Sequence, residues 1–225
     1  PAECILCGRG TVDCPQNAKV VHSDVAAVEA LLASGRPAYA SVAPSWAASF
    51  PFEQFEALEK ALVSLGFSGA METAEGAFLV KTRYEQLVRR DPSALWISSC
   101  CPSVVTLIEK HYPDLLPFVA PVLSPMEAHA KRIRDLHAGA AAVFFGPCIS
   151  KKEEARRGAL EGALTFEELF AWLERKDLLP KEEAPVAEPR RYCSRFFPTT
   201  GGILRTMERL PSVRYLAVEG VERCM

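Results

Sequence analysis

The 225-residue sequence has no long hydrophobic run and no excess of basic charge. Its longest weakly polar run, Ala138 to Ile149, is too short to span a bilayer and is interrupted by glycine and proline. The N-terminus has no signal-peptide pattern, so we expect a cytoplasmic protein without a membrane partner. Lys and Arg number 26 against 28 Asp and Glu, and this net charge of −2 is unfavourable for a nucleic-acid partner.

Several ligand-binding motifs are absent as well. The sequence contains no G-x-x-x-x-G-K-S/T phosphate loop, and the run Gly8-Arg9-Gly10 lacks the flanking elements and third glycine of a dinucleotide site. The four histidines show no metal-ligand spacing, and we expect His129 and His137 to form a surface pair. A Cys–His nucleophile stays open, although the adjacent Cys100 and Cys101 are an unusual arrangement for one.

Cysteine, in contrast, is abundant. The eight cysteines are Cys4, Cys7, Cys14, Cys100, Cys101, Cys148, Cys193 and Cys224. A chain of this size without a secretion signal does not need disulfide bonds for stability, so metal or redox chemistry is the better interpretation. The alternative, free cysteines that pack as small hydrophobic side chains, suits Cys193 and Cys224 better than the others.

Short apolar runs alternate with amphipathic segments along the chain. The runs predict strands over residues 38–43, 94–98, 141–145 and 214–218. The helical spacing of apolar residues predicts helices over residues 52–65, 77–90, 103–112, 125–136 and 166–176, the third with Ser103 as its N-cap. Residues 180–191, rich in proline and charge, predict an exposed loop. This alternation is typical of an α/β fold with mostly parallel sheets flanked by helices.

The cysteines of the main body follow two of the predicted strands. Cys100 and Cys101 come directly after residues 94–98, and Cys148 comes shortly after residues 141–145. Ligands in such folds bind where strands end and helices begin, so we expect these cysteines to lie together. The positive end of a helix dipole lowers the pKa of a nearby thiol, and thiolates bind iron–sulfur clusters, zinc or copper(I).

The N-terminal cysteines have a spacing of their own. Cys4, Cys7 and the pair Cys14-Pro15 differ at one position from the bacterial ferredoxin run C-x-x-C-x-x-C-x-x-x-C-P, because Gly10 replaces the third cysteine. Zinc is the rival ligand for a C-x-x-C pair, but the Cys-Pro ending favours iron and sulfur. Residues 1–23 are therefore predicted to be an incomplete ferredoxin-like iron–sulfur segment, whose cluster is impaired or lost.

Residues of the main body carry a family resemblance. The run Ser98-Ser99-Cys100-Cys101-Pro102 and its continuation resemble the first cluster-binding signature of the iron-only (diiron, FeFe) hydrogenases. The segment Gly146 to Glu153 resembles their second signature. Residues 42–45 resemble the loop that lines the diiron pocket, and residues 197–202 resemble the family's Gly-Gly segment. Val104, Val105 and residues 120–122 are closer to the hydrogenase-like sensory members than to fast catalytic ones.

This resemblance implies a role for each matching residue. Cys101 and Cys148 match two of the four cysteines that hold the 4Fe-4S cubane of the active-site H-cluster. Cys100 matches the cysteine that relays protons, and Lys151 matches the lysine that donates to a cyanide on the diiron subsite. The resemblance also assigns the wall of the cofactor pocket to Ala43, Pro44, Ser45, Ser124 and Pro147.

Two departures from the family pattern weaken a prediction of activity. The third signature, which carries the last two cubane cysteines, should follow Met225, and neither Cys193 nor Cys224 matches it. Residues 24–225 are therefore predicted to be a C-terminally incomplete hydrogenase-like domain of two lobes. The position of the family's proton-relay serine is occupied by Ala120, and Glu85 is a candidate substitute for a relay glutamate.

The resemblance implies reversible hydrogen oxidation and proton reduction at an H-cluster, and these departures favour a slow, sensory protein. Its expected partner is a ferredoxin-type electron carrier or a signalling domain outside this sequence. The alternative is a non-enzymatic iron–sulfur scaffold or cluster-assembly protein of the same fold, which binds a cubane without the diiron unit. Lys151 and the wall at Ala43, Pro44 and Ser45 favour the diiron pocket.

Overall fold

The computed structural model describes residues 3–158, 160–180, 193–220 and 223. Within them, a four-stranded parallel sheet has the strand order β2-β1-β3-β4. The strands are β1 (Ala38–Val42), β2 (Gly69–Glu72), β3 (Ala141–Phe145) and β4 (Gly162–Leu164). This architecture confirms the predicted α/β class with a parallel sheet.

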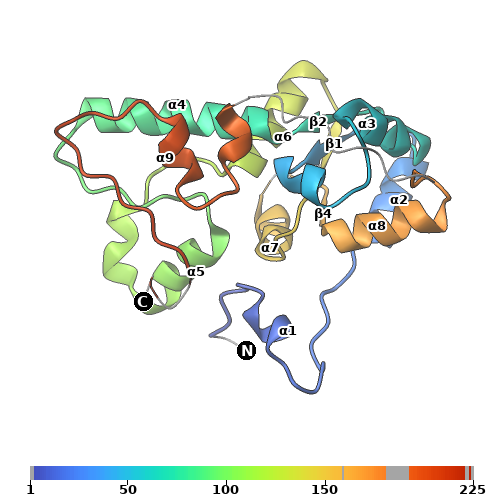
Figure 1. Cartoon of the computed structure of the whole chain (residues 1–225), viewed down its shortest axis with the longest axis horizontal. Coiled ribbons are helices and arrows are strands. Elements are labelled where there is room, and N and C mark those ends of the chain that lie inside the picture. Colours follow the sequence, from blue (N-terminus) through green and yellow to red (C-terminus); the bar gives the residue numbers. More distant parts are fainter. Residues whose placement is uncertain (1–2, 159, 181–192, 221–222, 224–225) are drawn as a thin grey trace.

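Helices cover both faces of the sheet (Figure 1). The α-helices are α1 (Arg9–Val12), α2 (Val25–Ala33), α3 (Phe55–Ser64), α4 (Ala74–Arg90), α5 (Pro102–His111), α6 (Pro125–Leu136), α7 (Ser150–Arg157), α8 (Phe166–Arg175) and α9 (Gly202–Thr206). The short 3-10 helices are η1 (Pro44–Ala48), η2 (Pro113–Phe118) and η3 (Cys193–Phe196). The predicted helices from residue 52 to residue 176 all form; 125–136 has the predicted ends, and the others differ by up to a few residues.

The two central strands form the centre of the core. All five residues of β3 are buried, and β1 pairs with β3 from Ala38↔Ala141 to Val42↔Phe145. Buried apolar runs of this kind need no alternation of polar residues, because both faces of the sheet are covered. The predicted strands 38–43 and 141–145 are thereby confirmed. The strands β2 and β4 were missed because each is short and contains glycine.

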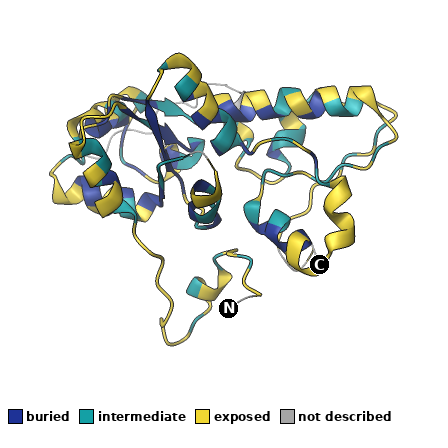
Figure 2. Cartoon of the chain, turned by 180° about the vertical axis from the view of Figure 1, so that it is seen from behind, coloured by how far each residue is buried: buried dark blue, intermediate teal, exposed yellow. Residues whose placement is uncertain are grey.

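Two parts of the molecule are joined by α4 and α6 (Figure 1). The sheet, with α2, α3, α7 and α8, forms one part, while α5, α9 and the C-terminal described residues lie in the other. Buried residues concentrate in the sheet and on the helix faces that pack against it, and the N-terminal segment is largely exposed (Figure 2). The division of the chain at residue 23 stays a prediction.

The helices α4 and α6 approach each other at a glycine. A Cβ atom at Gly76 would lie 2.1 Å from the carbonyl oxygen of Pro125 and 2.7 Å from Cβ of His129, so only glycine fits this contact. The start of α6 is fixed by a capping box, in which Ser124 Oγ accepts a hydrogen bond from Glu127 N and the Glu127 carboxylate accepts one from Ser124 N. The contact at Gly76 and the capping box together fix the position of the chain at Ser124 and Pro125.

Three local predictions are wrong. Residues 94–98 and 214–218 do not form strands, and in this part of the chain the only ladder element is the isolated bridge between Ile97 and Val119. Both segments instead line an apolar cavity of about 320 Å³ beside α4 and α9. The N-cap of α5 is Cys101, whereas Ser103 lies buried inside the helix. The predicted loop 180–191 lies outside the described residues, apart from Pro180.

Two polar residues of the helices α6 and α7 are buried. His129 is fully buried, and its Nδ1 lies 2.7 Å from Ser41 Oγ, so it does not form a surface pair with His137. Lys152 of α7 is 4% exposed, and its Nζ binds Asp24 and Glu168. Helical spacing predicts on which face of its own helix a residue lies. It does not predict which neighbouring elements cover that face, and these elements bury both residues.

No helix in the described ranges is both long enough and apolar enough to cross a membrane.

Candidate cofactor site at the ends of the parallel strands

The two cysteine-bearing turns of the main body lie next to each other. The turn at Cys100 and Cys101 leads into α5, and the turn at Cys148 leads into α7. Lys151 Nζ donates a hydrogen bond of 3.3 Å to the carbonyl oxygen of Cys100, which joins the two turns directly. The arrangement agrees with the general tendency of ligand sites to form where parallel strands end.

Cys100 is the more buried of the two adjacent cysteines. Its backbone N donates to Ser98 Oγ at 3.3 Å, and its Sγ lies 3.8 Å from the Tyr84 hydroxyl. Burial raises the pKa of the Cys100 thiol, although hydrogen bonds from Ser98 and Tyr84 act in the opposite direction. The expectation that the helix dipole lowers this pKa is therefore wrong for Cys100, whose thiol stays protonated at neutral pH.

Cys101 and Cys148 are exposed and free of disulfide bonds. The carbonyl oxygen of Cys101 accepts hydrogen bonds from Val104 N and Val105 N, so the start of α5 fixes the backbone of this cysteine. Cys148 Sγ lies 3.0 Å from Ser150 Oγ at the start of α7. Both sulfurs are thus accessible to a ligand while their backbones are held by helix termini.

Lys151 is held between the two turns. Its side chain is 13% exposed, and its Nζ lies 2.5 Å from the Glu154 carboxylate in addition to the contact with the Cys100 carbonyl. Burial raises the pKa of Glu154, while the nearby Lys151 lowers it. Lys151 therefore differs from a solvated surface lysine, because its ammonium group is fixed at the end of the strands.

The loop after β1 forms an adjacent wall. Ala43 N donates to the carbonyl oxygen of Phe145 at 2.8 Å, and Pro44 begins η1. The Ser45 hydroxyl is buried and has no hydrogen-bond partner among the described residues. A Cβ atom at Gly146 would lie 3.1 Å from Cβ of Ala43, so the two strand ends approach closely at this glycine.

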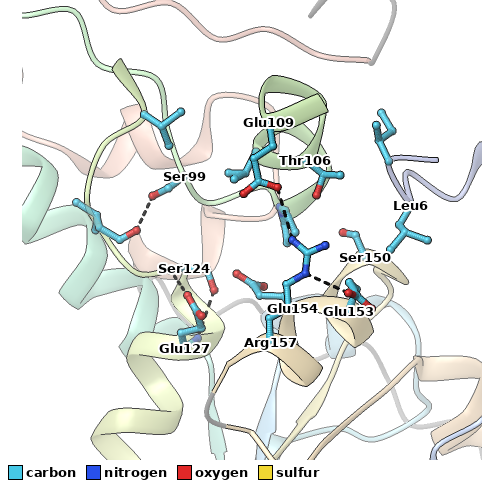
Figure 3. A pocket seen from close by; sticks show the side chains of 15 residues that line it. Leu6, Ser99, Thr106, Glu109, Ser124, Glu127, Ser150, Glu153, Glu154 and Arg157 are labelled. Atoms are coloured by element: carbon cyan, nitrogen blue, oxygen red, sulfur yellow. Dashed lines mark hydrogen bonds and ion pairs between the residues drawn. The ribbon is translucent and has the colours of Figure 1, made fainter. Parts of the chain in front are cut away.

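A cavity of about 240 Å³ lies between α5, α7 and the start of α6 (Figure 3). Leu6 of the N-terminal segment covers one side of it, and Ser99 and Ser124 line another. The remainder combines apolar side chains with charged ones, among which Arg157 lies 3.0 Å from Glu153 and 3.6 Å from Glu109. The cavity is therefore polar enough to hold water or charged groups.

The predicted wall residues Ser124 and Pro147 do not share a cavity. Ser124 lines the cavity of Figure 3, whereas Pro147 lines a different one with Ser49, Thr165 and Phe166. Ser124 also has a structural role, since its hydroxyl caps α6. The role of Pro147 at a cofactor stays a prediction.

The N-terminal cysteines are not gathered into one group. Cys4 and Cys7 are exposed, and Cys14 is half-buried, with a pKa lowered by backbone hydrogen bonds from Ala18 and Gln16. In the part of the chain that the structure describes, no three Cys, His, Asp or Glu side chains lie close enough together to hold a metal ion. The segment nevertheless contacts the main body, because Lys110 Nζ donates to the carbonyl oxygen of Cys4 at 2.8 Å.

Sequence reasoning missed the residue that contacts the Cys100 thiol. Tyr84 comes from α4, and burial raises its pKa to about 12, with a further contribution from Cys100. Glu85, the candidate relay residue, instead binds Lys81 at 3.1 Å and accepts a hydrogen bond from Glu208 N. Tyr84 lies four residues after the buried Val80, so helical spacing predicts that it is on the buried face of α4. The spacing does not predict that Tyr84 contacts Cys100.

Comparison with known families adds to this geometry. Residues 36–223 match the family model described as the iron-only hydrogenase large subunit, C-terminal domain. The chain belongs to the iron-only hydrogenase family. The match includes both cysteine-bearing turns, the loop after β1 and Lys151, and it leaves out the N-terminal cysteine segment.

Solved structures of FeFe-hydrogenases have the same fold. One, from work on oxygen inactivation and degradation of the 2Fe subcluster of the H cluster, has a TM-score of 0.65 and 22% identity. Another, from work on stepwise H-cluster assembly, has a TM-score of 0.63 and 24% identity. An apo variant of the hydrogenase HydA1 from Chlamydomonas reinhardtii has a TM-score of 0.64 and 24% identity.

The matches cover most of this chain but a smaller share of the hydrogenase chains. They cover 82% of this chain but only 56–57% of the hydrogenase chains. The sequence therefore spans little more than half the length of these FeFe-hydrogenases, and it includes the hydrogenase-type sheet with the helices around it.

Proposed function

We propose that this chain supplies part of an H-cluster site in a slow, sensory hydrogenase-type protein. In this proposal Cys101 and Cys148 are two ligands of a 4Fe-4S cluster, and Ala43, Pro44 and Ser45 line the pocket of a diiron subsite. The observation that carries the proposal is the contact of Lys151 Nζ with the Cys100 carbonyl, which joins the two cysteine turns in a member of the iron-only hydrogenase family.

The residues present fit such a cofactor. Two exposed thiols on adjacent helix starts are suitable soft ligands for iron. The buried Ser45 hydroxyl lacks a partner in the described part of the protein, and such a group is costly unless a ligand atom satisfies it. The ammonium group of Lys151 is nearby and already fixed, as recognition of an anionic ligand requires.

The chain's own residues then have separate tasks. The H-cluster, when bound, supplies the reversible conversion of hydrogen into protons and electrons. Lys151 donates a hydrogen bond to an anionic ligand of the diiron unit, and the buried Ser45 hydroxyl supplies a neutral donor. Cys100 holds a proton at neutral pH because burial raises the pKa of its thiol. Of the cubane ligands, this proposal assigns Cys101 and Cys148 to the chain.

Slow turnover follows from the surroundings of Cys100. Ala120 is 2% exposed and packs in one cluster with Val80, Tyr84 and Cys100. The side chain of Ala120 supplies no donor or acceptor to this wall, and proton transfer requires partners within hydrogen-bond distance. We expect hydrogen to change the state of the cluster and a ferredoxin-type carrier or a signalling domain to receive the change.

A test of the diiron pocket uses infrared spectra of protein loaded with a diiron unit that carries cyanide. The Lys151→Met variant should shift a cyanide stretching band and retain less diiron unit, because its donor is lost. The matched control is Lys131→Met on the exposed face of α6, where the lysine pairs with Asp135. Protein that binds a cubane but no diiron unit would instead support the scaffold alternative and contradict the proposal.

A further inference from the structure

The Glu72 carboxylate joins three segments at the carboxyl end of the sheet. Glu72 is the last residue of β2, and in the register of the sheet it lies beside Val42, which directly precedes the pocket wall at residues 43–45. Its Oε1 accepts a hydrogen bond of 2.8 Å from Trp46 Nε1. Its Oε2 accepts two hydrogen bonds from Arg195, 2.9 Å from Nε and 2.7 Å from Nη2. One side chain therefore holds a partner on each of two other segments.

Trp46 connects Glu72 to the pocket wall. It follows Ser45 directly and is 4% exposed. Its backbone N donates to the carbonyl oxygen of Ala43 at 3.0 Å, and its carbonyl oxygen accepts from Ser49 N and Phe50 N at 2.9 and 3.0 Å. Trp46 is thus the centre of the turn at η1, and fixing its indole fixes the backbone that carries the buried Ser45 hydroxyl.

Arg195 connects Glu72 to the Gly-Gly segment, residues 197–202. Arg195 lies in η3, and the carbonyl oxygen of Phe196 accepts hydrogen bonds from Thr199 N at 3.0 Å and from Thr199 Oγ1 at 2.7 Å. Gly202 N then donates to the carbonyl oxygen of Thr199 at 2.7 Å. A Cβ atom at Gly202 would overlap the Phe196 carbonyl group, so the segment folds tightly onto η3. The position of η3 therefore determines the position of the Gly-Gly segment.

The surroundings of Glu72 make this arrangement firm. The Glu72 side chain is 15% exposed, and that of Arg195 is 30% exposed, so solvent screens the pair only in part. Its backbone is held as well, because Thr73 N donates to the carbonyl oxygen of Val42 at 2.8 Å. Glu75 lines the same groove beside α4 but is exposed. Glu75 is therefore a suitable comparison for the role of Glu72.

We propose that Glu72 is a positioning residue of the cofactor pocket, because it fixes the wall at residues 43–45 through Trp46 and the Gly-Gly segment through Arg195. The inference rests on the proposed function, in which this wall lines a diiron subsite. The two effects are separable, since each carboxylate oxygen accepts from one of the two partners.

The first experiment uses protein without cofactor. The three tryptophans give three indole N–H signals in a proton–nitrogen NMR spectrum, and Trp46→Phe identifies the signal of Trp46. We expect this proton to exchange with solvent several-fold faster in Glu72→Gln, because a hydrogen bond to a charged acceptor is roughly twice as strong as one to a neutral acceptor. The signal of Trp172, which is 2% exposed in the core, should keep its rate and report that the protein is folded.

Two variants serve as comparisons in this experiment. Glu75→Gln makes the same substitution at the exposed neighbour and should leave the Trp46 signal unchanged. Arg195→Met should change the Trp46 rate less than Glu72→Gln, because the Oε1 contact remains. An unchanged Trp46 rate in Glu72→Gln, or an equal change in Glu75→Gln, would overturn the role of Glu72.

The second experiment uses the longest natural protein that contains this chain, loaded with a diiron unit that carries cyanide. Infrared bands of the diiron unit should shift in Glu72→Gln and in Arg195→Met, and they should stay in place in Glu75→Gln. Ser45→Ala removes the donor itself. If Glu72 acts through Ser45, the band that Ser45→Ala shifts should lie at the same position in the Glu72→Gln/Ser45→Ala double variant.

The outcomes separate this inference from the proposed function. Bands identical in wild type and Glu72→Gln would overturn the positioning role, as would shifts that simply add in the double variant. Failure of wild type to take up a diiron unit would contradict the proposed function, and the exchange of the Trp46 proton would still decide whether Glu72 holds the turn at η1.

Discussion

At the scale of single residues, burial determines the protonation state of a polar side chain, as His129 shows. His129 is fully buried and its Nδ1 lies 2.7 Å from Ser41 Oγ, while its Nε2 has no partner among the described residues. Ser41 Oγ in turn lies 2.9 Å from Thr73 Oγ1. Burial, helped by the charge of Arg132, lowers the pKa of His129 from 6.5 to about 4.

This shift predicts a loss of stability in mild acid. Above pH 6.5 the imidazole is neutral in both states, so its contribution is complete. Between pH 6.5 and about 4 the His129 imidazole binds a proton in the unfolded chain but stays neutral in the folded protein. The free energy of unfolding therefore falls over this range. The loss approaches ~3 kcal/mol at the lower end.

Urea unfolding at pH 7.5 and pH 4.5 measures this effect. The loss on acidification should be smaller in His129→Gln than in wild type, and His22→Gln serves as the control because the His22 side chain is 79% exposed. The same acid sensitivity in wild type and His129→Gln would show that His129 is not the group responsible.

At the scale of elements, local signals predict helices well and isolated strands poorly. The helix Pro125–Leu136 was predicted with its observed ends, because Ser124, Pro125 and Glu127 are a complete local start signal. Residues 94–98 and 214–218 have strand-like sequences, but a strand also requires a partner, and no local pattern reports one. Tyr84 was missed for the same reason, since its contact with Cys100 joins separate elements.

The crossing of α4 and α6 gives a prediction for the variant Gly76→Ala. In an open helix this change would stabilise the protein by ~0.5–1 kcal/mol. Here the added Cβ would meet the Pro125 carbonyl oxygen at 2.1 Å, so we expect a loss of ~1–3 kcal/mol instead. Thermal unfolding would show this, with exposed Glu75→Ala as the control, and a stabilised Gly76→Ala protein would contradict the close packing.

The N-terminal segment gives a second prediction at this scale. Cys4, Cys7 and Cys14 do not form a common metal group in the described structure, and Gly10 supplies no thiolate. The Gly10→Cys variant fits, because its Cβ would displace only the end of the Lys19 side chain. We expect added iron in this variant only when a further ligand is supplied from outside the segment. Full iron occupancy of the segment in the wild-type sequence would contradict this account.

At the scale of the whole molecule, the fold brings together what the sequence keeps apart. The parallel sheet places the ends of β1 and β3 beside each other, and α7 then meets the turn before α5 through Lys151. The cysteine spacing and the family resemblance predicted which residues lie there. They did not predict the cavity lined by Ser99 and Glu154, because its walls come from three helices and the N-terminal segment.

The central claim is that Cys101 and Cys148 hold one iron–sulfur cluster. The most direct measurement is the iron and acid-labile sulfide content, with EPR after reduction, of the longest natural protein that contains this chain, reconstituted without oxygen. We expect a 4Fe-4S signal in wild type and in Cys7→Ser, and its loss in both Cys101→Ser and Cys148→Ser. A cluster that persists unchanged in the Cys101→Ser/Cys148→Ser double variant would contradict the claim.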